Sequence, residues 1–149
     1  MPGYAGGILP NPTYYQVETG KTGYAQVSRI EYDPAKITFS DLLTVFFATH
    51  DPTTLNRQGA DVGTQYRSAI FYTTPAQKQE SEKFIAELNS SGKQILTELE
   101  PLTEFYPAEE SHRQYYKNNQ SAPYCQVIIS PKIEKLKKRF NELLKEAEQ

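Results

Sequence analysis

Cysteine is almost absent from this sequence of 149 residues, which contains only Cys125. A single cysteine excludes an internal disulfide and fits a reducing compartment. Long apolar runs are also missing, because stretches such as LLTVFFA are far shorter than the roughly 20 residues that a membrane-spanning helix needs. We therefore expect a cytoplasmic protein with no signal peptide and no membrane association.

An excess of charge of one sign is missing as well. The sequence has 16 Lys and Arg residues and 18 Asp and Glu residues, for a net charge of -2. This balance creates no field that would draw the protein to nucleic acid or to anionic lipid. The basic run at residues 135–139 is flanked by Glu134 and Glu142 and is typical of the solvated face of a helix. We therefore expect no nucleic-acid partner.

What the sequence does contain indicates one domain over residues 1–149, since 38% of the residues are apolar and 12% are aromatic. Apolar spacing, with turn and cap residues, predicts the order of the elements. Strands are expected at residues 25–32, 67–73, 93–102 and 124–130, and helices at residues 38–52, 74–92, 108–119 and 131–147. Mixed strands and helices of this length favour an α+β fold, a two-layer α/β sandwich in which helices cover a sheet.

Three stretches between these elements lack a regular pattern and are rich in Gly, Tyr and polar residues. They cover residues 3–26, 50–68 and 105–125, and we expect loops there outside the strands and helices given above, among them the short helix at residues 108–119. Such loops often form binding sites. From the residues alone, Tyr14 and Tyr66 are more typical of half-buried packing rings than of ligand contacts, and Asp61 could equally form an Asx turn.

The exact sequence motifs in these stretches are more specific than their composition. The segments GYAGG, NPTYYQV, TGKTGYAQV, YDP, HDPTTLNRQGADVGTQYRSAIFY, FYPAEESHRQYY and PYCQVIISPK occur in this order over nearly the whole chain. Together they resemble the A-type peptide methionine sulfoxide reductases, which reduce the S epimer of methionine sulfoxide. The resemblance implies a ferredoxin-like mixed sheet and the repair of oxidised proteins. It also implies free methionine sulfoxide as a substrate, thioredoxin as the reductant, and no metal or other cofactor.

The resemblance further implies a segment that this sequence does not contain. In the family, a first strand and a Gly-Cys-Phe-Trp-Gly motif with the nucleophilic cysteine precede GYAGG. Here there is no Trp, and the one cysteine lies in PYCQV. We therefore expect a chain that is truncated at its N-terminus relative to the family, without the family's first strand and helix.

Site residues follow from the resemblance position by position. Tyr14 and Tyr66 match phenols that donate hydrogen bonds to the sulfoxide oxygen, and Asp61 matches a carboxylate beside them. Gln26 stands where the family has its proton-donating glutamate, and an amide cannot transfer a proton at neutral pH. Tyr24, which replaces a histidine, either brings a phenol to the same place or packs on a turn.

Cys125 matches a position that in some relatives is the resolving thiol, and a cysteine before QVIIS is also typical of a buried strand residue. Three interpretations therefore stay open. The chain is a reductase whose front is missing from the sequence, a non-catalytic relative that binds oxidised methionine or a protein partner, or a reductase that uses Cys125 with an external thiol.

Overall fold

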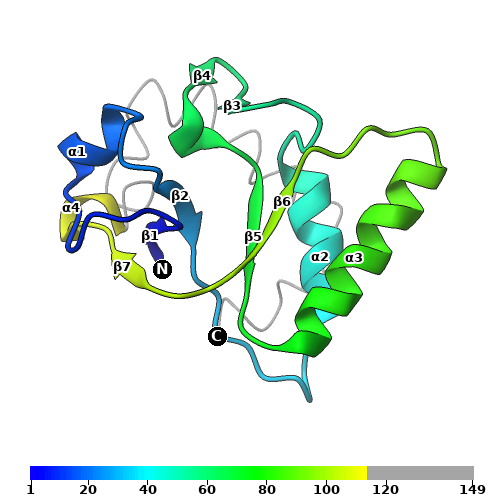
Figure 1. Cartoon of the computed structure of the whole chain (residues 1–149). Helices are drawn as coiled ribbons and strands as arrows, with labels where there is room; N and C mark the ends of the chain where they lie inside the picture. Colours follow the sequence, from blue (N-terminus) through cyan, green and yellow to red (C-terminus); the bar gives the residue numbers. More distant parts are fainter. Residues whose placement is uncertain (114–149) are drawn as a thin grey trace, which may run out of the picture.

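The computed structural model describes residues 1–113 and has the predicted α+β class (Figure 1). In chain order its elements are β1 (Pro2–Ala5), α1 (Tyr14–Glu18), β2 (Ala25–Ser28), α2 (Phe39–Thr49), β3 (Arg57–Gln58), β4 (Asp61–Val62), the 3-10 helix η1 (Thr64–Tyr66), β5 (Ala69–Tyr72), α3 (Pro75–Ser90), β6 (Glu98–Pro101), β7 (Phe105–Pro107) and α4 (Glu110–Arg113). The strand and the closing helix expected after residue 113 lie outside the described residues.

The sheet nearest the site is antiparallel and has the order β2-β1-β7. Tyr4 is paired with Gln26 on one side and with Tyr106 on the other. Gly3, also in β1, is buried, and a Cβ atom at this position would lie 2.4 Å from the Phe105 ring and from the Tyr106 carbonyl oxygen. Only glycine therefore lets the three strands approach this closely.

A second, parallel pair joins β5 to β6, and α3 connects them. Figure 1 shows α2 and α3 side by side next to this pair, and the stacked rings of Phe47 and Phe84, 5.3 Å apart, join the two helices. The predicted caps are present. Thr74 accepts a hydrogen bond from the Gln77 N–H, Pro75 is the first residue of α3, and Gly92 follows its end with a positive φ.

The prediction of three irregular stretches was wrong in part, because each holds short regular elements. The first contains β1 and α1, the second β3, β4 and η1, and the third β7; α4, also in the third, lies within the helix that was predicted at residues 108–119. These elements have two to five residues, too few for a periodic pattern to emerge. The strand predicted for residues 25–32 is also shorter, since β2 ends at Ser28.

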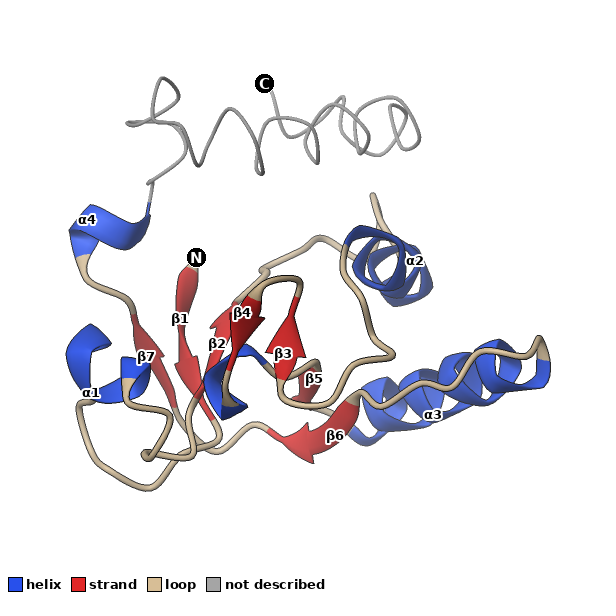
Figure 2. Cartoon of the chain, turned by 90° about the horizontal axis from the view of Figure 1, so that it is seen from above, coloured by secondary structure: helices blue, strands red, loops and turns tan. Residues whose placement is uncertain are grey.

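The buried core of the described residues is small and lies mainly beside the antiparallel sheet. Val17, on α1, is fully buried and clusters with Tyr4, Tyr24 and Ala108. Figure 2, which views the molecule from above, shows α1 next to β7 and β1. Among the helices within residues 1–113, none has the length and apolar character that crossing a membrane would require.

Candidate active site

A cavity of about 620 Å³ lies where α1, η1 and the antiparallel sheet meet. Four of the five site residues expected from the sequence line this one cavity. Its lining residues are Pro2, Gly3, Tyr4, Tyr14, Glu18, Gln26, Val27, Ser28, Asp61, Tyr66 and Ala108. Tyr14, Gln26, Asp61 and Tyr66 are thus brought together, whereas Cys125 lies outside the described residues.

Helix α1 places two of the polar groups. Thr13 caps it, with its hydroxyl accepting from the Gln16 N–H while the Gln16 side chain accepts from the Thr13 N–H. Gly20, with a φ of 72°, follows the helix end in the left-handed conformation that glycine adopts without strain. Tyr14 and Glu18 are four positions apart and so share one face of the helix, which is the face toward the cavity.

Glu18 is the centre of the polar network, and the sequence analysis missed it. Its Oε1 atom accepts a hydrogen bond from the Tyr66 hydroxyl over 2.9 Å and another from the Gln26 Nε2 atom over 3.1 Å. The only local signal was the helical spacing from Tyr14. The partners of Glu18 come from η1 and β2, and their proximity is a product of the tertiary structure.

Burial and nearby carboxylates keep the two cavity phenols protonated. Burial and the hydrogen bond to Glu18 raise the pKa of Tyr66 from 10.0 to about 12, and the charge of Asp61 contributes. Burial likewise raises the pKa of Tyr14, together with the charge of Glu18 and a hydrogen bond to it. Both hydroxyls therefore remain hydrogen-bond donors throughout the neutral range.

Glu109, the residue before α4, forms hydrogen bonds to two of the residues that line the cavity. The hydroxyl of the buried Tyr4 donates to Oε2 of Glu109 over 2.8 Å, and the Tyr14 backbone N–H donates to Oε1 of the same side chain over 2.7 Å. Burial and this carboxylate raise the pKa of Tyr4. One side chain thus ties the start of α1 to the middle strand of the sheet.

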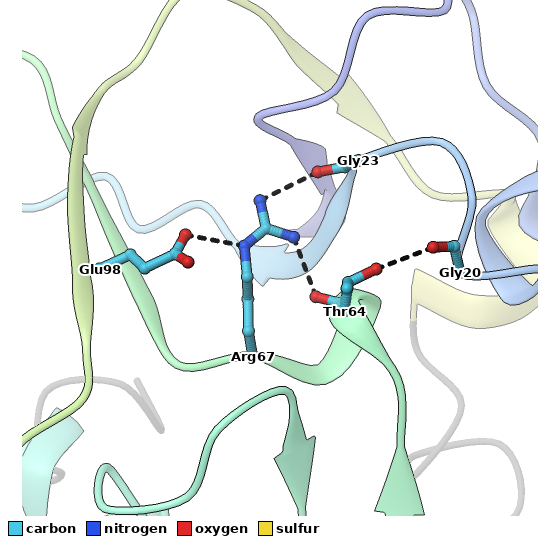
Figure 3. Close-up of polar contacts among 5 residues, drawn as sticks. All are labelled: Gly20, Gly23, Thr64, Arg67 and Glu98. Carbon is cyan, nitrogen blue, oxygen red and sulfur yellow. Dashed lines mark hydrogen bonds and ion pairs between the residues drawn. The ribbon is translucent and has the colours of Figure 1, made fainter.

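Arg67 holds η1, and with it Tyr66, against the loop that leads into β2 (Figure 3). Its guanidinium donates to the Gly23 carbonyl, to the Thr64 carbonyl and to Glu98 Oε2, each over 2.9 Å. The Thr64 hydroxyl adds a bond of 2.9 Å to the Gly20 carbonyl. The Arg67 side chain is only 10% exposed, and its bonds to Glu98 and Thr64 are partly buried, whereas the bond to Gly23 is exposed.

Tyr24 packs its ring in the core and does not bring a phenol to the cavity. Its ring is 3% exposed and lies 6.0 Å from the Tyr106 ring, edge to face. Its hydroxyl donates to the Leu9 carbonyl, and the residue is not part of the cavity lining. Within residues 1–113, no group of three or more His, Cys, Asp and Glu side chains is arranged to hold a metal ion.

Residues 1–144 match the family model described as peptide methionine sulfoxide reductase. The chain belongs to this family. It is 50% identical over 146 residues to the peptide methionine sulfoxide reductase MsrA of Deinococcus radiodurans, with 96% of this chain and 71% of that protein covered. It is 52% identical over 143 residues to MsrA of Acinetobacter baumannii, with 96% and 83% covered.

Two solved structures also share this fold. The reduced form of Mxr1 from Saccharomyces cerevisiae superposes with a TM-score of 0.78 at 40% identity, over 83% of this chain and 72% of that one. Methionine sulfoxide reductase A of Corynebacterium diphtheriae gives 0.72 at 40% identity, over 81% and 63%. The resemblance found in the motifs is therefore confirmed, and the chain is an oxidoreductase of the methionine sulfoxide reductase class.

Proposed function

We propose that the cavity binds the side chain of methionine (S)-sulfoxide, either within an oxidised protein or as the free amino acid. Tyr14 and Tyr66 donate hydrogen bonds to the sulfoxide oxygen, and Asp61 lies beside them. The observation that carries the proposal is the gathering of these three residues with Gln26 around one cavity in a chain of this family. Of the described residues that line it, none is Lys, Arg or His, so the lining suits a neutral, polar sulfoxide better than an anion.

The proposed reaction consumes two thiols and forms water. A thiolate attacks the sulfoxide sulfur, the oxygen takes a proton and passes to the attacking sulfur, and methionine leaves a sulfenic acid behind. A second thiol then attacks the sulfenic sulfur, so that a disulfide and water form. Thioredoxin reduces this disulfide, and the cycle repairs oxidised methionine in proteins.

The source of the attacking thiol follows from the family resemblance. Its cysteine belongs to a Gly-Cys-Phe-Trp-Gly segment that is not among these 149 residues, and Cys125 is the one thiol that they contain. We therefore expect the 149-residue polypeptide to bind sulfoxide without thioredoxin-coupled turnover. Turnover that disappears in Cys125→Ser would contradict this expectation and assign the attack to Cys125.

A binding experiment tests the proposed site directly. Calorimetry with the N-acetyl amides of methionine (S)-sulfoxide, its R epimer and unoxidised methionine should show binding of the S epimer alone. Tyr66→Phe should weaken that binding about tenfold, the effect of losing roughly 1.4 kcal/mol from one hydrogen bond. Tyr15→Phe is the matched control, because Tyr15 is on α1 next to Tyr14 but is 82% exposed. Equal affinity for all three ligands, or no affinity for any, would refute the proposed site.

A further inference from the structure

The glutamate of the cavity comes from a different element than the family motif implies. The motif position for the glutamate, on β2, holds Gln26, yet a carboxyl is present one hydrogen bond away, on Glu18 at the end of α1. The two side chains lie 3.1 Å apart between Nε2 of Gln26 and Oε1 of Glu18. The exchange of glutamate for an amide on β2 is thus matched by a glutamate on the neighbouring helix.

The hydrogen bonds to Glu18 leave the sulfoxide oxygen short of donors. A tyrosine hydroxyl has one proton, and Tyr66 donates it to Glu18 Oε1, so Tyr66 can donate to a bound sulfoxide oxygen only once this bond to Glu18 is released. The same oxygen also accepts from Gln26, and the Tyr14 hydroxyl is hydrogen-bonded to Glu18 as well, so this carboxyl group engages both cavity phenols. A sulfoxide oxygen only accepts hydrogen bonds and carries negative charge, so an ionised Glu18 repels it. Protonation of Glu18 turns the carboxyl from a competitor into a donor.

We propose that Glu18, as its neutral acid, donates a hydrogen bond to the bound sulfoxide oxygen and supplies the proton that this oxygen takes up during reduction. This inference rests on the proposed function. Glu18 is then a catalytic residue, while Gln26 is a positioning residue whose amide orients it. In the reductive step the O–H bond of Glu18 breaks, and the sulfoxide oxygen gains the proton and moves to the sulfur of the attacking thiolate. The proton that the thiol released to solvent when the thiolate formed is balanced by one that Glu18 later takes from solvent.

The titratable groups around the cavity besides Glu18 are phenols and carboxyl groups. Tyr4 on β1, Tyr14 on α1, Asp61 on β4 and Tyr66 on η1 line the cavity with Glu18, and Glu109, after β7, is bonded to Tyr4. No cation lines the cavity among residues 1–113.

Proton uptake on binding is the measurement that separates this inference from the proposed function. Calorimetry of the full chain with N-acetyl-methionine (S)-sulfoxide amide, in buffers of different ionisation enthalpy, should show uptake of about one proton per ligand at neutral pH. Affinity should fall about tenfold for each pH unit toward the alkaline side. In Glu18→Gln the ligand should still bind, with no proton uptake and no such pH dependence.

Asp61→Asn distinguishes the two cavity carboxyls, since proton uptake should persist in it. Uptake that survives in Glu18→Gln, or binding of the unmodified chain without uptake, would overturn the role of Glu18 while leaving the sulfoxide site intact. Absence of binding to the unmodified chain would overturn both.

The side-chain carboxyl ¹³C shift of Glu18 in the unmodified chain gives an independent measurement that needs no variant. The shift should change to the neutral-acid value when the sulfoxide is added. An unchanged shift in the bound state would refute the inference.

Discussion

The Tyr4 hydroxyl donates a hydrogen bond over 2.8 Å to Glu109, 105 positions later in the chain. The other oxygen of the same carboxylate accepts from the Tyr14 N–H, the first backbone N–H of α1. A carboxylate at this end of a helix also interacts favourably with its free N–H groups. Glu109 therefore sets the position of α1, and with it Tyr14 and Glu18, relative to the sheet.

Glu109→Ala should lower the free energy of unfolding by about 1 kcal/mol, because it removes two hydrogen bonds that are partly exposed to water. It should also weaken sulfoxide binding, since α1 loses its anchor. Urea unfolding and calorimetry measure the two effects. Glu110→Ala is the matched control, as the next residue is an exposed glutamate in the first turn of α4. Equal effects of the two substitutions would contradict the bracing role.

Arg67→Lys should destabilise the fold by about 1.5–3 kcal/mol, because a lysine cannot reach three separate acceptors with a planar fork. The Gly23 and Thr64 carbonyl groups would lose their charged donor. Arg57→Lys, at an exposed position in β3, should change the stability little. Urea unfolding of both variants checks this, and a pair of indistinguishable midpoints would show that the Arg67 bonds contribute nothing net.

The raised pKa of Tyr66 leads to a prediction for the free energy of unfolding at alkaline pH. Its folded-state pKa of about 12 lies above the ordinary value of 10.0, so the folded protein holds the phenolic proton more tightly than the unfolded chain does. The resulting stabilisation is complete below pH 10 and is lost as the pH rises toward 12. Tyr66→Phe should therefore lose stability less steeply over this range than the unmodified protein. Tyr15→Phe should follow the unmodified curve, and the prediction fails if the slopes of all three proteins agree.

A double exchange tests the relation between Glu18 and Gln26. Glu18→Gln combined with Gln26→Glu returns the carboxyl to β2 and keeps an amide one hydrogen bond away. Proton uptake on sulfoxide binding, which Glu18→Gln alone is expected to abolish, should return in this pair. The matched control combines Glu18→Gln with Gln16→Glu, which adds the carboxyl at an exposed position on α1 and preserves the capping box. Recovery in the control as well would show that net charge, and not the place of the carboxyl, governs the uptake.

Local sequence signals were sufficient for the family, the α+β class and most long elements. The sequence motifs alone identified the methionine sulfoxide reductase family. They also selected Tyr14, Asp61 and Tyr66, which line one cavity. Cap chemistry located α3 at both ends, because a threonine, a proline and a glycine act on the residues next to them in the chain. Such effects are complete within one or two helical turns.

The strand β1, the strand β7 and the role of Glu18 were decided by tertiary structure alone. β1 and β7 have four and three residues, and their pairing joins residues about a hundred positions apart, which no local period encodes. Glu18 becomes chemically significant only because sheet register places Gln26 beside it and η1 brings in Tyr66, 48 positions later. Sequence by itself determined which side chains were available and which family the chain belongs to. The packing of short elements determined which carboxyl group meets which phenol, since a hydrogen bond depends on distances of about 3 Å that only the folded chain sets.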